Sequence, residues 1–284
     1  MKLSKLLSVF ILALLALKSF AADSVLVVSM DGVHPVAIAG HTTPTLHALM
    51  QQPGRYSMRG RSVEPPRTLI AHTAMLTGMP TRHISKTDQE WFPGQPQVAW
   101  PTLFDDMKAA DYRTAFFYAV PKLGFLINPA IGTHAYAPKD GIERARAFFK
   151  DTGKRFVFLQ LPGMPWEIYE NRQFTKEYLE QLARTDAALA PLFDDLRKRG
   201  DYVIVVTSAH SGPDYFRDYD HPEDYKVPLI SFSNRNRTAL LVQAVDADGY
   251  PGSVSHGVRN RTLALGDRDW LITELRDLVG KLIK

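Results

Sequence analysis

Residues 24–32 read SVLVVSMDG, and this stretch decides how the rest of the sequence is interpreted. Its apolar start, residues 24–29, is rich in valine and predicts a short buried strand. Asp31 and Gly32 follow directly, so the predicted strand ends in a carboxylate. An Asp-Gly pair is common in turns. The carboxylate could instead bind a metal ion or pair with a base, and at this point all three roles stay open.

Strand-like and helix-like runs alternate along the rest of the chain. Further strands are predicted at residues 112–120, 156–161, 202–207 and 227–232. Helices are predicted at residues 102–110, 141–149, 175–199 and 271–283. Strands that alternate with helices indicate an α/β fold. We therefore expect a three-layer sandwich around a mostly parallel central sheet.

The N-terminus has the pattern of a secretory signal peptide. A basic start is followed by an apolar run at residues 6–17, and small residues allow cleavage after Ala21. The run is too short to span a bilayer, which takes about 20 residues. The alternative is an uncleaved N-terminal anchor. We expect a signal peptide at residues 1–21, a single domain without a transmembrane segment at 22–284, and a periplasmic or secreted protein.

Charge and cysteine content exclude several classes of protein. The chain has 34 Lys+Arg and 30 Asp+Glu, for a net charge of +4, and three of the lysines lie in the leader. The remainder therefore carries a net charge of only +1, and nothing favours nucleic acid as a partner. Cysteine is absent, which rules out disulfides, thiolate metal sites and a Cys nucleophile.

Polar residues follow the predicted strands at the places where α/β proteins bind ligands. In open α/β sheets, ligands gather at the carboxyl ends of strands. Asp31, Gly163 and His210 occupy such positions here. Thr68 begins a predicted helix, TLIAHTAMLTG, after a Pro-rich turn. Its ordinary role would be an N-cap, and its chemical role would be a nucleophile at a helix N-terminus, where backbone N–H groups favour an anion.

Two histidines lie among small residues that allow close approach to a ligand. They are His210, in SAHSG, and His256, in SHG. Taken alone, each is more often a structural residue than a ligand. His72, in the helix after Thr68, could face either side of that helix.

Together these residues resemble the alkaline phosphatase superfamily, and within it the type I phosphodiesterase/nucleotide pyrophosphatase family. The resemblance spans about residues 24–257 and is strongest in the first hundred residues. The residues that carry it are Met30-Asp31-Gly32, Thr43-Pro44-Thr45-Leu46, Pro66-Arg67-Thr68-Leu69-Ile70-Ala71-His72, Leu76-Thr77-Gly78, Ser208-Ala209-His210 and Ser255-His256-Gly257.

The resemblance implies a metal-dependent hydrolase, and the length of the chain predicts a core without a large cap. Proteins of this family bind two metal ions, usually zinc, and a Thr or Ser attacks phosphorus to form a covalent intermediate. Carried over, Thr68 is the nucleophile and also a metal ligand. Asp31 and His210 bind the metal ion that activates it, and His256 binds the other ion. The implied substrate is a small phosphorylated molecule.

The sequence departs from the family pattern at the metal ligands. Ala209-His210 stands where the family has Asp-His, and Gly163 and Glu167 stand where it has Asp and His. Of six usual protein ligands, only Asp31, His210 and His256 match, and Glu167 is a possible oxygen donor. A catalytic zinc normally has three protein ligands. Zinc remains the expected ion, one or two per chain, with manganese or magnesium possible if carboxylates replace the missing ligands.

These observations support two hypotheses for the function. The first is a secreted, metal-dependent phosphoric-ester hydrolase of the phosphodiesterase/pyrophosphatase type that uses Thr68. The second is a catalytically degenerate relative that binds an anionic ligand or a protein partner at the same place. Sulfate-ester hydrolysis is disfavoured, because those enzymes need Cys or Ser at the nucleophile position and this chain has Thr68.

Overall fold

The computed structural model describes residues 22–51, 54–84, 90–164, 174–212, 222–234 and 270–283. The predicted signal peptide, residues 1–21, lies outside these ranges. Within them, no helix combines the length and the apolar character needed to cross a membrane.

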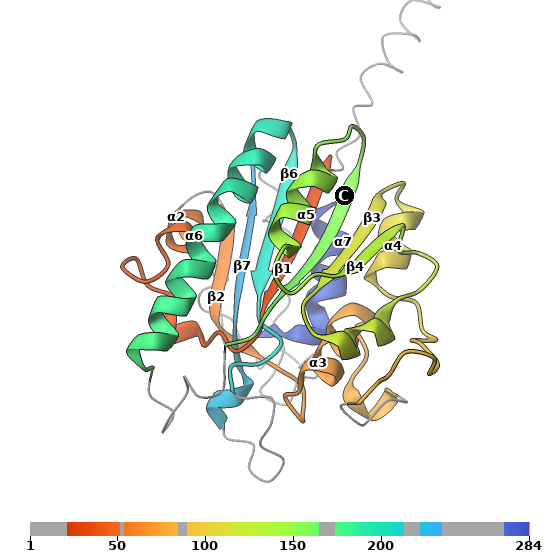
Figure 1. Ribbon diagram of the computed structural model, residues 1–284, viewed down its shortest axis with the longest axis horizontal. Helices are drawn as coiled ribbons and strands as arrows, with labels where there is room; N and C mark the ends of the chain where they lie inside the picture. The colour runs from red at the N-terminus through yellow and green to blue at the C-terminus, as the bar shows by residue number, and fades with distance from the viewer. Residues whose placement is uncertain are drawn as a thin grey trace, which may run out of the picture.

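A single eight-stranded sheet forms the centre of the described residues (Figure 1). Its strands are β1 (Ser24–Met30), β2 (Gly54–Arg61), β3 (Arg113–Tyr118), β4 (Thr133–Tyr136), β5 (Arg155–Leu161), β6 (Tyr202–Thr207), β7 (Lys226–Ser233) and β8 (Trp270–Leu271). The spatial order is β4-β3-β5-β1-β6-β7-β2-β8. All neighbouring pairs are parallel except those that β7 makes with β6 and β2. The expectation of a mostly parallel sheet is confirmed.

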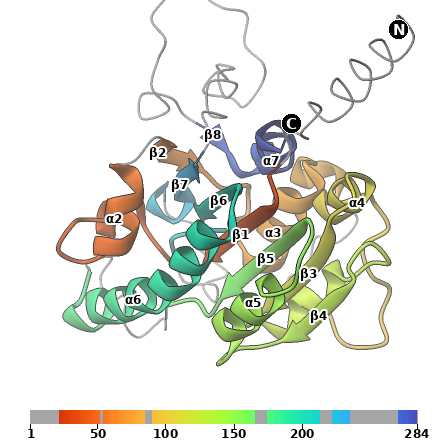
Figure 2. The ribbon, with the colours of Figure 1, turned by 90° about the horizontal axis from the view of Figure 1, so that it is seen from above.

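Helices cover both faces of the sheet, which makes three layers (Figure 2). The α-helices are α2 (Pro44–Met50), α3 (Thr68–Thr77), α4 (Leu103–Ala109), α5 (Gly141–Phe149), α6 (Lys176–Arg199) and α7 (Leu275–Leu282). Side chains alternate across β1: Val25 and Val27 join the apolar cluster under α3, α4 and α7, whereas Leu26 and Val28 join the cluster under α2, α5 and α6. The uninterrupted apolar run of β1 is therefore explained by burial on both faces.

Short 3-10 turns connect these elements. They are η1 (Pro35–Ala37), η2 (Thr81–His83), η3 (Pro121–Leu126), η6 (Pro222–Tyr225) and η9 (Ile272–Glu274).

Four predicted strands after β1 and the helices near α4, α5 and α6 are confirmed within a few residues. The helix predicted at 271–283 is confirmed as α7, but it begins later than predicted, because β8 and η9 occupy residues 270–274. Trp270 pairs there with Gly60 of β2, a contact that local periodicity does not indicate.

The carboxyl ends of β1, β5 and β6 converge at one edge of the sheet. The loops that follow them are bonded to one another through the backbone: Gly32 N–H donates to His210 O over 2.9 Å, and Met164 N–H donates to Asp31 O over 3.2 Å. This pairing brings three distant parts of the sequence together. It places Asp31, Gly163 and His210 at a common site, as the strand-end argument predicts.

The amino end of α2 is capped by a carboxylate from another helix. Asp186 of α6 is fully buried and accepts hydrogen bonds from Thr45 N at 2.8 Å and Leu46 N at 2.9 Å. We predict that Asp186→Ala lowers the free energy of unfolding by about 2–3 kcal/mol, because one buried and one partly buried N–H donor lose a charged acceptor. Urea denaturation measures this difference.

The matched control is Asp194→Ala on the same helix. Asp194 is half-exposed and pairs with Arg197 at the surface. That change should stay within about 0.5 kcal/mol of wild type. Equal effects of the two substitutions would contradict the capping role of Asp186.

Candidate active site

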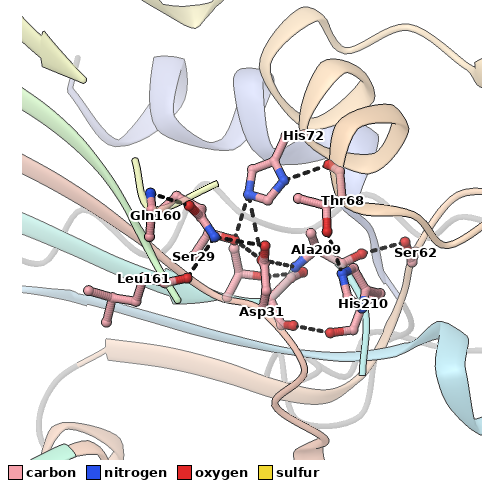
Figure 3. Close-up of polar contacts among 12 residues, drawn as sticks. Ser29, Asp31, Ser62, Thr68, His72, Gln160, Leu161, Ala209 and His210 are labelled. Atoms are coloured by element: carbon pink, nitrogen blue, oxygen red, sulfur yellow. Dashed lines mark hydrogen bonds and ion pairs between the residues drawn. The ribbon is translucent and has the colours of Figure 1, made fainter. Parts of the chain in front are cut away.

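Asp31 lies at the end of the central strand and is only 2% exposed. Its carboxylate accepts hydrogen bonds from three neutral donors (Figure 3). Ser29 Oγ donates to Oδ1 at 3.0 Å, Gln160 Nε2 donates to Oδ2 at 3.0 Å, and Ala209 N–H donates to Oδ1 at 3.4 Å. A buried carboxylate without partners would be strongly destabilising. These donors fix its orientation and compensate for its burial.

Thr68 is the first residue of α3 and is buried beside His210. The N-cap of the helix is Arg67, so the ordinary role considered for Thr68, an N-cap, is wrong. The hydroxyl instead lies 3.0 Å from His210 Nε2. Because the amino end of a helix carries the positive end of the helix dipole, an anion near Thr68 would be stabilised there.

The ring of His210 is oriented by the backbone. Its Nδ1 lies 2.7 Å from Gly212 O, and a carbonyl oxygen only accepts, so Nδ1 carries the proton. In the neutral ring, Nε2 is then an acceptor for the Thr68 hydroxyl. A hydroxyl, an imidazole and a group that orients the imidazole form the arrangement of an activated nucleophile. The same orientation is typical of a metal-binding histidine, so the Nε2 lone pair suits either role.

His72 links the Thr68 turn to Asp31, although its sequence position left its direction open. It is fully buried, with Nδ1 2.7 Å from Thr68 O. Its Nε2 lies 3.0 Å from Ser29 Oγ and 3.6 Å from Asp31 Oδ1 (Figure 3). His72 follows Thr68 by four residues, about one helical turn. This spacing was the sequence signal that could have indicated its contact with the Thr68 turn.

Gln160 is a second site residue that the sequence reasoning missed. It is 1% exposed and lies in the apolar strand β5. Its Oε1 accepts from Ala119 N–H at 2.7 Å, while Nε2 donates to Leu161 O at 2.6 Å as well as to Asp31. The amide orientation is therefore set by both of its ends. A lone polar residue in the otherwise apolar run at residues 156–161 was the signal that could have identified it.

Of the three positions that depart from the family pattern, Gly163 and Ala209 lie against Asp31. A Cβ added to Gly163 would be 3.5 Å from the Cβ of Asp31, an ordinary contact distance. Ala209 contributes its N–H to Asp31 and has no side-chain donor for a metal. A side-chain Cβ would therefore fit at position 163, but the chain has glycine there.

The described residues bring together Asp31, Thr68 and His210 of the predicted metal-binding set (Figure 3). Glu167 and His256 lie outside the described ranges. Inside those ranges, no group of three or more His, Cys, Asp or Glu side chains could hold a metal ion. The described donors therefore form an incomplete site for one ion. Ligands from other parts of the chain would have to complete it.

Two family models match adjacent parts of the sequence. The model for type I phosphodiesterase/nucleotide pyrophosphatase matches residues 25–118, and the sulfatase model matches residues 119–255. The first segment contains Asp31 and Thr68, and the second contains His210. No curated protein matches the sequence.

Solved structures show the same fold at low sequence identity. The lipoteichoic acid synthase LtaP from Listeria monocytogenes has a TM-score of 0.62 and 16% identity, covering 93% of this chain and 73% of that one. The C-terminal periplasmic domain of EcEptC from Escherichia coli, in complex with Zn, has a TM-score of 0.60 and 13% identity, covering 93% and 82%. An alkaline phosphatase superfamily protein from Vibrio parahaemolyticus has a TM-score of 0.59 and 14% identity, covering 93% and 67%.

Fold and site define an α/β protein whose candidate nucleophile and metal ligands lie at the carboxyl edge of its sheet. Together with the two family models, they show that the chain belongs to the alkaline phosphatase superfamily. Members of this superfamily hydrolyse or transfer phosphoric or sulfate esters.

The contact between Gln160 and Asp31 can be tested by substitution. Gln160→Leu keeps a similar volume but removes the donor to Asp31 Oδ2 and the acceptor for Ala119 N–H. We predict a loss of about 2–3 kcal/mol in the free energy of unfolding, because buried polar groups are left unpaired. Urea denaturation gives the value. The control Gln181→Leu, on α6, should change stability by less than about 0.5 kcal/mol, and a similarly small effect of Gln160→Leu would contradict the role proposed for its amide.

Proposed function

We propose that this chain is a metal-dependent hydrolase of phosphoric esters, of the phosphodiesterase/nucleotide pyrophosphatase type, with Thr68 as its nucleophile. The observation that carries the proposal is the 3.0 Å contact between Thr68 Oγ1 and His210 Nε2 at the amino end of α3. This contact presents a hydroxyl beside a nitrogen acceptor at the end of a helix that favours anions. The match of the phosphodiesterase model to the segment containing Thr68 supports the same assignment.

The proposed reaction uses Thr68 twice. Its hydroxyl oxygen attacks phosphorus and the ester oxygen departs, which leaves a phosphothreonine; water then cleaves the new P–O bond and regenerates the hydroxyl. The amino end of α3 and its N–H groups face the charge that develops on the phosphate oxygens. His72 holds the Thr68 carbonyl and so fixes the turn that carries the nucleophile. The proposed substrate is a small phosphorylated molecule.

Asp31, Thr68 and His210 would hold one divalent cation, and Glu167 and His256 would complete the metal site or bind a second ion. With the cation bound, the His210 Nε2 lone pair would bind the metal in place of the Thr68 proton, so the 3.0 Å contact describes the metal-free site. Bound there, the cation would lower the pKa of the Thr68 hydroxyl and neutralise charge on the phosphate. Zinc is the proposed ion, with manganese or magnesium as alternatives, and the Zn complex of the EcEptC domain supports zinc. That relative is a periplasmic domain, in keeping with a proposed periplasmic or secreted location.

A catalytically degenerate binding protein is the second candidate. The observation that favours it is the environment of Asp31, where Gly163 and Ala209 supply no side-chain ligand and neutral donors already satisfy the carboxylate. Such a protein would keep the helix end at Thr68 as an anion-binding place without turnover. Sulfate-ester hydrolysis stays disfavoured, because the sulfatase model matches only residues 119–255 and the nucleophile position holds Thr68.

Thr68→Ala tests the nucleophile. We expect hydrolysis of bis(4-nitrophenyl) phosphate to fall by about three orders of magnitude or more, because no hydroxyl remains to attack. The free energy of unfolding should change by only about 1–2 kcal/mol, the scale of one buried hydrogen bond. Thr68→Ser, which keeps a hydroxyl, is the control and should retain measurable turnover. Equal rates for wild type and Thr68→Ala would refute the assignment.

Metal content separates the two candidate functions. We expect elemental analysis of protein purified without chelator, then supplied with Zn or Mn, to give one or two ions per chain. His210→Ala should lose bound metal and Glu167→Ala should bind it more weakly, whereas His134→Ala, on the exposed edge strand β4, should not. Unchanged metal content in His210→Ala would remove that residue from the site. No ion under any loading would favour the degenerate binding protein.

A further inference from the structure

A cavity lies at the opposite, amino edge of the sheet. Arg113 and Arg155 are the first residues of β3 and β5 and are paired in register, and Arg155 is also in register with Ser24 of β1. The strand β1 has 7 residues, which at about 3.3 Å per residue separates this edge from Asp31 by about 20 Å. The cavity is therefore distinct from the candidate active site.

Positive side chains dominate the walls of the cavity. Its volume is about 450 Å³, and the charged residues that line it are Lys108, Arg113, Arg155 and Asp151. Three cations thus meet one carboxylate, in a protein whose charge is otherwise nearly balanced. Tyr112 and Phe148 add aromatic surface. A concave surface with an excess of one charge concentrates ions of the opposite sign.

Arg155 forms a fixed part of the wall. Its side chain is only 2% exposed, and its guanidinium contacts Asp151 Oδ2 at 3.1 Å and Thr152 O at 3.2 Å. The guanidinium carbon also lies 4.8 Å from the centre of the Phe148 ring. Burial lowers the pKa of Arg155, and the neighbouring cations Arg113 and Arg199 lower it further, partly opposed by Asp151. Positive charge is therefore crowded at this edge of the sheet.

Arg113 and Lys108 supply donors that remain available. Both are exposed at the rim. The guanidinium of Arg113 makes no hydrogen bond or ion pair with any residue that the structure describes. Lys108 Nζ donates to Pro129 O at 2.9 Å, which leaves two of its three N–H groups for a ligand.

We infer that this cavity binds an anion that carries a phosphate group, independently of the chemistry at Thr68. A guanidinium offers a planar pair of donors that matches two phosphate oxygens, and an ammonium adds a point charge beside it. The cavity is larger than one phosphate ion needs and falls within the range of about 300–1,000 Å³ typical of small-molecule sites. The ligand is therefore a phosphorylated small molecule or the headgroup of an anionic phospholipid.

The test compares phosphate binding by wild type and by Lys108→Ala/Arg113→Ala, in the full chain, by isothermal titration calorimetry with inorganic phosphate. We expect the double variant to bind at this cavity at least about tenfold more weakly, because two charge-assisted contacts are lost. The control Lys176→Ala/Arg184→Ala removes the same charge from exposed positions on α6 and should bind like wild type. Thermal unfolding of both variants should match wild type, because all four side chains are exposed.

The same comparison distinguishes phosphate bound at Thr68 from phosphate bound in the cavity. Binding that is unchanged in Lys108→Ala/Arg113→Ala belongs to another place and overturns the inference, as does failure of wild type to bind either probe. The second probe is vesicles of phosphatidylcholine with and without phosphatidylglycerol. If wild type cosediments with phosphatidylglycerol vesicles and the double variant does not, the ligand is a lipid headgroup. If wild type binds soluble phosphate but not the vesicles, the ligand is a free phosphorylated molecule.

Discussion

The burial of the Asp31 carboxylate at the end of the central strand is the constraint on which the rest of the site depends. A carboxylate with 2% exposure must be compensated by donors from the protein. Because β1 lies between β5 and β6, both neighbouring strands deliver such donors: Gln160 from β5 and the N–H of Ala209 after β6. His72 of α3 lies near the same carboxylate and is also hydrogen-bonded to the Thr68 carbonyl. One buried charge thereby ties the sheet to the helix that bears the candidate nucleophile.

This arrangement also explains how the chain differs from the pattern of its superfamily. The positions where that pattern has further carboxylates hold Gly163 and Ala209, and both lie directly against Asp31. Additional carboxylates there would raise the negative charge around Asp31 and call for cations to balance it. Here neutral donors provide the compensation, so Asp31 is held in place by the protein itself. The chemistry proposed for the site then depends on the contact between Thr68 and His210 and on ligands contributed by Glu167 and His256.

Different ionisable side chains lie at the two edges of the sheet. In a parallel sheet all strands begin at one edge and end at the other, so residues at the same position of neighbouring strands form a row. At the carboxyl edge this row contains Asp31 and His210, and at the amino edge it contains Arg113 and Arg155. Register alone is thus enough to bring together residues from distant parts of the sequence. The proposed anion site and the proposed active site are two products of the same topology.

The sequence by itself determined the fold class and part of the site. Continuous apolar runs predicted β1, β5 and β6, and the long amphipathic repeat predicted α6, since buried strands and half-buried helices leave clear periodic patterns. It did not predict β2, whose sequence GRYSMRGR contains three arginines and two glycines. That strand forms because β7 and β8 pair with its backbone, and backbone pairing leaves no periodic signal.

Within the site, Asp31, Thr68 and His210 could be found because each follows or begins a predicted element. Only the tertiary structure identified His72 and Gln160 and decided that Arg67, not Thr68, caps α3. The partner of His72, Ser29, is 43 residues away, and the partner of Gln160, Asp31, is 129 residues away. Whether a buried polar side chain has a hydrogen-bonding partner depends on packing between elements, and local sequence carries no record of that packing.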